Sequence, residues 1–164
     1  MAGIVIRPAV ADDQRLLWEF LAMAAYEPNA DAVKAIPFAA AFLDGWQRPD
    51  DFGFVAERAG LAIGATWARQ FASHEQWPFY IDDRTPEMSI GVNENDRGQG
   101  VGQLLVCALI DEATHRGLRL CLNVRDTNPA RRLYERIGFR AVPGMIFPNR
   151  VGGRSIGMVL GALS

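Results

Sequence analysis

The stretch from Glu87 to Val124 constrains the fold most, because a strand, a glycine-rich loop, a helix and a second strand are predicted there in succession. Apolar residues alternate with polar or small ones over residues 87–92, which is the period-2 pattern of a strand. Residues 101–116 are apolar on most sides, so they predict a helix that packs on a sheet, and Gly117 is placed to end it. Residues 118–124 alternate again. Two strands joined through one helix predict a crossover with parallel strands.

The loop between the first strand and the helix has the sequence Arg97-Gly98-Gln99-Gly100-Val101-Gly102. Glycine has no Cβ, so the backbone can turn tightly and direct several N–H groups at one anion. The N-terminus of the following helix adds roughly half a positive charge. The loop therefore predicts a site for a phosphate or pyrophosphate, and the alternative is a glycine-rich turn without a ligand.

Three better-known motifs do not fit the sequence. A dinucleotide-binding loop would need a third glycine at position 103 and a P-loop would need lysine there, but the residue is Gln103. Residues 153–157 match the G-x-S-x-G pattern of serine hydrolases, yet no helix is predicted to follow them and His115 is the last histidine. Nicotinamide-dinucleotide binding, nucleotide hydrolysis and serine-hydrolase chemistry are thus disfavoured.

The other elements are predicted from shorter patterns. They are a strand at 4–6, a helix beginning behind Asp12 and Asp13, a broken helical segment over 30–43 with Pro37 inside it, an antiparallel hairpin of strands 52–57 and 61–71, an ordered loop with aromatic residues over 72–86, a helix capped by Asn128 that starts at Pro129 and ends at Gly138, and two last strands at 139–147 and 155–160.

Length, charge and composition limit the protein's class. The 164 residues, 49% of them hydrophobic, suit a single domain over 1–164 with a substantial core. A net charge of −2 without a basic tract makes nucleic acid an improbable partner. The longest uncharged run, Gly98–Ile110, is shorter than the roughly 20 residues that cross a membrane, and no secretory signal is evident, which predicts a cytoplasmic protein. Cysteine and histidine are too sparse to indicate a disulfide or a metal site.

Residues 87–139 resemble the GNAT acetyltransferase superfamily, whose acetyl-CoA loop follows the pattern [Arg/Gln]-x-x-Gly-x-[Gly/Ala]. Arg97, Gly100 and Gly102 match that loop. The order of the neighbouring segments is also similar: Ile90-Gly91-Val92, the helix, Asn123-Val124, Asn128-Pro129-Ala130, and Leu133-Tyr134-Glu135-Arg136-Ile137-Gly138-Phe139. Residues 1–86 match only in the order of their elements, so they say little about the acetyl acceptor.

The resemblance implies an α/β fold of the α+β type: a mixed, mostly antiparallel sheet with helices on both faces. One parallel pair of strands would splay apart around the pantetheine arm of acetyl-CoA. The implied acetyl-CoA contacts are Ile90, Gly91, Val92, Arg97, Gly98, Gln99, Gly100, Val101, Gly102 and Asn128, with the pyrophosphate on residues 99–102. Backbone N–H groups near residues 90–92 would bind the developing oxyanion. The alternative to an acetyl-CoA contact for Arg97 is a solvated side chain on the surface.

Two side chains match catalytic positions of that family. Tyr134 would protonate the departing thiolate, because a phenol of pKa near 10 is a competent acid toward a thiolate whose thiol has a pKa of about 8.5. Its alternative is a packed tyrosine on the apolar stripe of its helix. Glu87 would be the general base, acting on the amine or through water, and its alternative is a solvated carboxylate at a strand end.

The implied activity is transfer of the acetyl group of acetyl-CoA to a primary amine, by direct attack in a ternary complex. The acceptor would be a small molecule or the N-terminus of a peptide or protein, and no metal is required. The alternative is a non-catalytic acyl-CoA-binding module that senses the ligand or binds a partner. Exposed edge strands also allow a homodimer.

Overall fold

The predicted order of strand, glycine loop, helix and strand is present in the structure, a computed structural model that describes residues 3–161. The first strand is β4 (Glu87–Val92), the helix is α4 (Val101–His115) and the second strand is β5 (Cys121–Arg125). β4 and β5 pair in parallel, with Glu87 opposite Cys121. Gly117 follows α4 with a φ of +70°, a left-handed conformation that glycine adopts readily.

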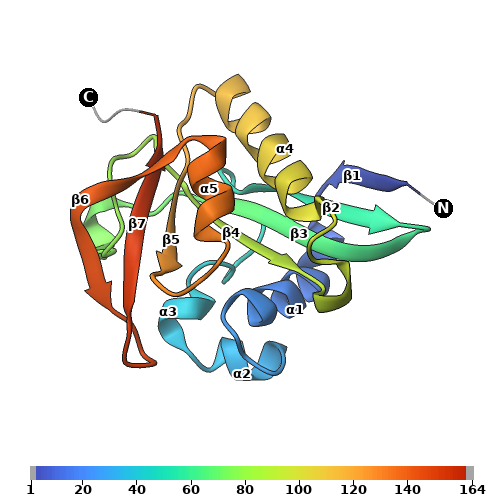
Figure 1. The fold of residues 1–164 in the computed structure, drawn as a ribbon, viewed down its shortest axis with the longest axis horizontal. Helices are drawn as coiled ribbons and strands as arrows, with labels where there is room; N and C mark the ends of the chain where they lie inside the picture. Colours follow the sequence, from blue (N-terminus) through green and yellow to red (C-terminus); the bar gives the residue numbers. More distant parts are fainter. Residues whose placement is uncertain (1–2, 162–164) are drawn as a thin grey trace. The chain divides into compact units, whose positions relative to one another are not determined.

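The remaining elements agree with the predicted order (Figure 1). They are β1 (Ile4–Pro8), η1 (Ala11–Asp13), α1 (Gln14–Ala24), α2 (Ala30–Lys34), α3 (Pro37–Ala40), β2 (Phe52–Arg58), β3 (Leu61–Arg69), η2 (Ser73–Glu75), η3 (Glu94–Asp96), α5 (Arg131–Ile137), β6 (Phe139–Pro148) and β7 (Arg154–Leu160). Pro37 opens α3, where its missing N–H costs no hydrogen bond, so the helical segment is broken as predicted.

Contacts group the described residues into two compact units. The first holds the residues up to Arg69 together with Ser89–Glu112, and the second holds Gln70–Met88 together with the residues from Ala113 on. Hydrogen-bonded strands follow the order β1-β2-β3-β4 in the first unit and β4-β5-β7-β6 in the second. The β1–β2, β2–β3, β5–β7 and β6–β7 pairs are antiparallel and the β4–β5 pair is parallel, which confirms the mixed, mostly antiparallel architecture.

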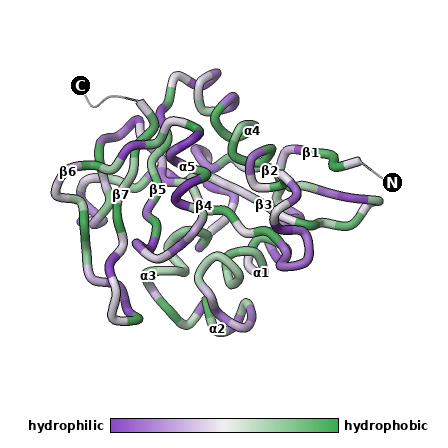
Figure 2. The backbone as a smooth tube through the Cα atoms, viewed as in Figure 1, coloured by the Kyte–Doolittle hydropathy of each residue, from purple (hydrophilic) through white to green (hydrophobic). Residues whose placement is uncertain are grey.

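Helices cover both faces of the strands in the first unit. On one face, Val101 and Leu105 of α4 belong to a buried cluster against which Ile90 and Val92 of β4 pack. Gly91 lies between these two residues and faces the other way, and a Cβ on it would clash with the carbonyl oxygen of Phe20 in α1. Figure 2 shows the hydrophobic stretch of α4 that this packing buries. The absence of a side chain at Gly91 therefore allows α1 to approach β4.

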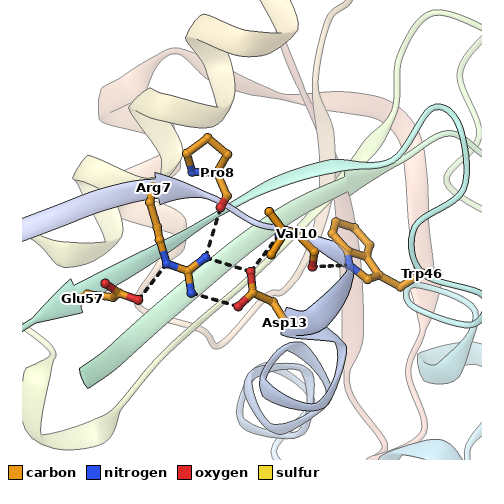
Figure 3. A network of polar contacts seen from close by, with 6 residues as sticks. All are labelled: Arg7, Pro8, Val10, Asp13, Trp46 and Glu57. Carbon is orange, nitrogen blue, oxygen red and sulfur yellow. Dashed lines mark hydrogen bonds and ion pairs between the residues drawn. The ribbon is translucent and has the colours of Figure 1, made fainter. Parts of the chain in front are cut away.

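A charged network fixes the start of α1 against β1 and β2 in the first unit (Figure 3). Arg7 donates to both carboxyl oxygens of Asp13, at 2.8 and 2.9 Å, and to Glu57 at 2.7 Å. The backbone N–H of Val10 also donates to Asp13, and the indole of Trp46 donates to the carbonyl of Val10. The hydrogen bonds from Arg7 lower the pKa of Asp13, so the carboxylate keeps its charge in the network.

Several element boundaries differ from the predictions. The strand predicted over 61–71 ends at Arg69, and the strand predicted over 4–6 continues to Pro8. The strand predicted over 118–124 begins only at Cys121, because the N–H of Leu118 bonds back to Ala113 at the end of α4. Alternating apolar residues indicate which side chains are buried, and they do not show which residues pair with a neighbouring strand. Leu120, for example, is buried but lies outside β5. The helix predicted to start at Pro129 starts at Arg131, since the preceding residues form i to i+3 turns instead.

None of the helices within residues 3–161 has the length and apolar character needed to cross a membrane.

Candidate active site

The glycine loop lies in the first unit, between β4 and the first turn of α4. Gly98 and Gly100 have φ values of +72° and +84°, which residues with a side chain rarely adopt. A Cβ placed on either would meet no atom within 4 Å. The need for glycine here is therefore conformational, and the surface beside both residues is open to a ligand. The 15-residue helix α4 directs its positive end toward this loop.

The loop is held by side chains of the same unit. Arg58, at the end of β2, donates to Asp96 at 2.6 Å and to the Gln99 side chain at 2.9 Å. Gln99 in turn donates to the carbonyl of Asn95 at 3.1 Å. These contacts orient the Gln99 side chain toward Arg58 and Asn95. Arg58 is a contributor that the sequence patterns did not reveal, because its partners lie about 40 residues away.

The other residues of the first unit that are predicted to contact acetyl-CoA lie in different environments. Arg97 is exposed, and its Nε donates to the carbonyl of Val92 at 3.2 Å. The side chains of Ile90 and Val92 are partly buried and pack against the core cluster of this unit. Gly91 has a packing role against α1, as described above. The cofactor-binding roles of these residues stay predictions.

Glu87 lies in the second unit and is buried, with 2% of its surface exposed. Its Oε2 accepts a hydrogen bond from the indole N–H of Trp77 at 2.5 Å, and its Oε1 accepts one from the side-chain amide of Asn123 at 2.5 Å. Burial raises the pKa of the Glu87 carboxyl to about 7, while the two hydrogen bonds oppose that rise. This position is not the solvated strand end that was the alternative for Glu87, because the residue is buried and both of its carboxyl oxygens accept hydrogen bonds within the protein.

Trp77 and Asn123 were not predicted as partners of Glu87. The sequence marks Trp77 as one of several aromatic residues in an irregular loop, and Asn123 as a polar position in an alternating strand that belongs to the family resemblance, with no contact to Glu87 indicated for either. The sequence contained one indication of such a contact. Asn123 is a polar residue on a strand predicted to pair with a parallel neighbour, and a polar side chain inside a sheet needs a hydrogen-bonding group nearby.

Asn128 and Tyr134 also belong to the second unit. The side-chain oxygen of Asn128 accepts a hydrogen bond from the N–H of Ala130 at 2.9 Å, so it stabilises the turn before α5. Tyr134 is 7% exposed, and its ring meets that of Phe139 edge to face with centroids 6.0 Å apart. Gly138 ends α5 with a φ of +123° and donates to the carbonyl of Tyr134. The packing of Tyr134 is compatible with both of its predicted roles.

The buried carboxyl of Glu87 gives a prediction about stability. The pKa of Glu87 is about 7 in the folded protein against an ordinary value of 4.5. The folded state therefore holds the proton more tightly, and wild-type stability falls relative to Glu87→Gln as the pH rises from about 4.5 to about 7. The expected relative loss is about 3 kcal/mol, measured by urea unfolding across this range. Glu94→Gln, at an exposed position, is the control. A pH-independent difference between wild type and Glu87→Gln would contradict the prediction.

Comparison with known proteins agrees with the fold and the loop. Residues 15–139 match the sequence model of the Acetyltransferase (GNAT) family. The chain belongs to this family.

Three similar proteins illustrate the range of relatives. Mycothiol acetyltransferase of Thermobispora bispora is 37% identical over 97 residues, which are 57% of this chain and 31% of that protein. The [ribosomal protein bS18]-alanine N-acetyltransferase of Haemophilus influenzae is 36% identical over 81 residues, 48% of this chain and 56% of that protein. The chain thus spans from about a third to just over half of the length of these curated relatives. The structure of yncA from Salmonella typhimurium, with its cofactor acetyl-CoA, has a TM-score of 0.70 and 23% identity, and the match covers 96% of this chain and 92% of that one.

Proposed function

We propose that residues 1–164 form a single catalytic domain that transfers the acetyl group of acetyl-CoA to a primary amine. In this reaction the amine nitrogen attacks the thioester carbonyl carbon and forms the amide bond. The carbon–sulfur bond breaks, the amine loses a proton to a base, and the departing thiolate takes up a proton to become free CoA. The products are the acetylated amine and the thiol.

The glycine loop is the observation that carries the proposal. Its two left-handed glycines leave the backbone uncovered at the positive end of a long helix, which suits the pyrophosphate of acetyl-CoA. Gly98, Gln99, Gly100, Val101 and Gly102 would contact that group. Bound there, acetyl-CoA supplies an activated acyl group, and the protein needs only to orient the amine and manage two protons.

Glu87 suits the role of general base. A base works best when its pKa lies near the operating pH, and the pKa of Glu87 is about 7. Above that pH the carboxylate can take the proton of the amine, directly or through water. Tyr134 would give a proton to the thiolate, and backbone N–H groups of Ile90 to Val92 would stabilise the oxyanion. A buried carboxyl of this kind also favours an enzyme over a module that only binds acyl-CoA.

The acceptor in this proposal is a small amine or the N-terminus of a peptide or protein. The curated relatives are named for both kinds, one for mycothiol and one for an alanine of ribosomal protein bS18. The match to each covers little more than half of this chain or less. Both classes of acceptor therefore belong in the test.

The test is acetyl-CoA turnover with a panel of amines that includes small polyamines, amino sugars and peptides that begin with alanine. Thiol release measures the rate, and mass spectrometry identifies the acetylated product. Release that depends on the amine and exceeds hydrolysis without it supports the proposal. Tight binding of acetyl-CoA with no amine-dependent release across the panel would favour the binding module instead.

A further inference from the structure

We infer that Trp77 and Asn123 are positioning residues for Glu87. Each donates a hydrogen bond to a different oxygen of the carboxyl, and together they orient it and set how readily it takes up a proton. The inference rests on the proposed function for its link to catalysis, but the contacts themselves are independent of any substrate.

The two donors approach Glu87 from separate parts of the second unit. Trp77 comes from the loop over residues 72–86, and its indole can only donate. Asn123 comes from β5, two residues beyond Cys121, which is the residue paired with Glu87. Since both oxygens have a donor at 2.5 Å and the residue is 2% exposed, rotation of the carboxyl would break at least one contact in a buried environment.

The indole of Trp77 is itself held in place. Its ring stacks on that of Phe71 with centroids 4.0 Å apart and planes within 7° of parallel. Phe71 is buried, and its carbonyl accepts a hydrogen bond from the side chain of Gln70 at 2.8 Å. The same amide group donates to the carbonyl of Asp82 at 2.9 Å, so it joins the start of the loop to a point near its end.

The far end of the loop is fixed by Asp82. Its carboxylate accepts hydrogen bonds from Thr85 at 2.7 Å, from the N–H of Arg84 at 2.8 Å, and from Arg119 at 2.9 Å. Arg119 lies just before β5, and its own N–H donates to the carbonyl of Arg84. The loop is therefore tied to the β4–β5 region at one end and to Phe71 at the other, which directs the indole N–H at Glu87.

Few other charges act near the Glu87 carboxyl among the residues that the structure describes. Cys121 faces it from β5, and burial raises the pKa of that thiol well above its ordinary value, which keeps it neutral. Asp82 is paired with Arg119. Of the described groups that contact the carboxyl, Trp77 and Asn123 favour its charged form, whereas burial favours the neutral form.

Removing either donor should therefore make Glu87 a weaker acid. The variants are Trp77→Phe, which keeps an aromatic ring against Phe71 without the N–H, and Asn123→Leu, which keeps the size without the amide. Each should raise the pH at which Glu87 titrates by about one unit, the effect expected for one hydrogen bond to a charged group. Tyr80→Phe is the matched control, because its hydroxyl bonds Asp83 in the same loop and not Glu87.

Two measurements on the full chain test the inference. Carbon-13 NMR of labelled glutamate carboxyls, with Glu87→Gln to assign the signal, follows the titration directly. In the pH profile of kcat/KM, measured with the amine that reacts fastest, the acidic limb should move to higher pH by the same amount in each variant. If neither Trp77→Phe nor Asn123→Leu moves the NMR titration, or if Tyr80→Phe moves it equally, the inference is wrong.

The design separates this inference from the proposed function. If the wild type acetylates no amine, the proposed function fails, yet the NMR titration still decides whether the two donors control Glu87. If the titration moves while the rate profile does not, Glu87 is not the group that limits the reaction, and a positioning role in catalysis is overturned. Should Trp77→Phe fail to fold, Asn123→Leu and the conservative Asn123→Ser carry both measurements.

Discussion

Gly102→Glu is expected to abolish acetyl-CoA binding, with a Kd at least about 100-fold weaker than that of the wild type. Gly102 lies in the first turn of α4, where a bound pyrophosphate would meet the helix N-terminus. A glutamate there would occupy that space and oppose the phosphate charge. Isothermal titration calorimetry with acetyl-CoA measures the change.

Folding should survive this substitution. Gly98 and Gly100 have left-handed backbones, but Gly102 is inside the helix, where glutamate has a better helix propensity than glycine. Gln103→Glu is the matched control, since it adds the same charge one residue further on, at an exposed position. An unchanged Kd in folded Gly102→Glu would show that the loop does not hold the pyrophosphate.

Tyr134→Phe is expected to lower kcat by about 100-fold or more while the affinity for acetyl-CoA changes little. The substitution removes only the hydroxyl, so the ring keeps its edge-to-face contact with Phe139. Loss of a proton donor to the thiolate would act on the chemical step, which is why kcat should fall more than binding. Steady-state thiol release and calorimetry together give this comparison.

The packing alternative for Tyr134 makes the opposite prediction. If the residue only fills the core, Tyr134→Phe should turn over amines at the wild-type rate under conditions where chemistry limits kcat. Thermal unfolding of the same variant serves as the control. A large fall in Tm would show that damaged packing, and not the loss of a proton donor, causes a lower rate.

Much of the fold follows from short-range patterns. The alternation over β4, the apolar run of α4 and Gly117 at its end predict the order of these elements without reference to any tertiary contact. The glycine loop was predictable for the same reason, because a left-handed backbone at Gly98 and Gly100 is a local property that glycine alone tolerates well.

Boundaries and partners did not follow from those patterns. Alternating apolar residues show which side chains are buried, but pairing depends on a neighbouring strand, so β5 starts later than its pattern suggested. Arg58 contacts the glycine loop from the end of β2, and nothing local to either segment indicates this contact.

The sequence by itself determined the class of this protein, since the order of elements, the anion-binding loop and the family resemblance all depend on residues that are close in the chain. Only the tertiary structure decided the state of Glu87. Glu87 is buried, and its hydrogen bonds are to Trp77 and Asn123, which lie 10 and 36 residues away from it along the chain. The proton affinity of a carboxyl depends on the solvent and donors around it in space, and folding alone brings those groups together.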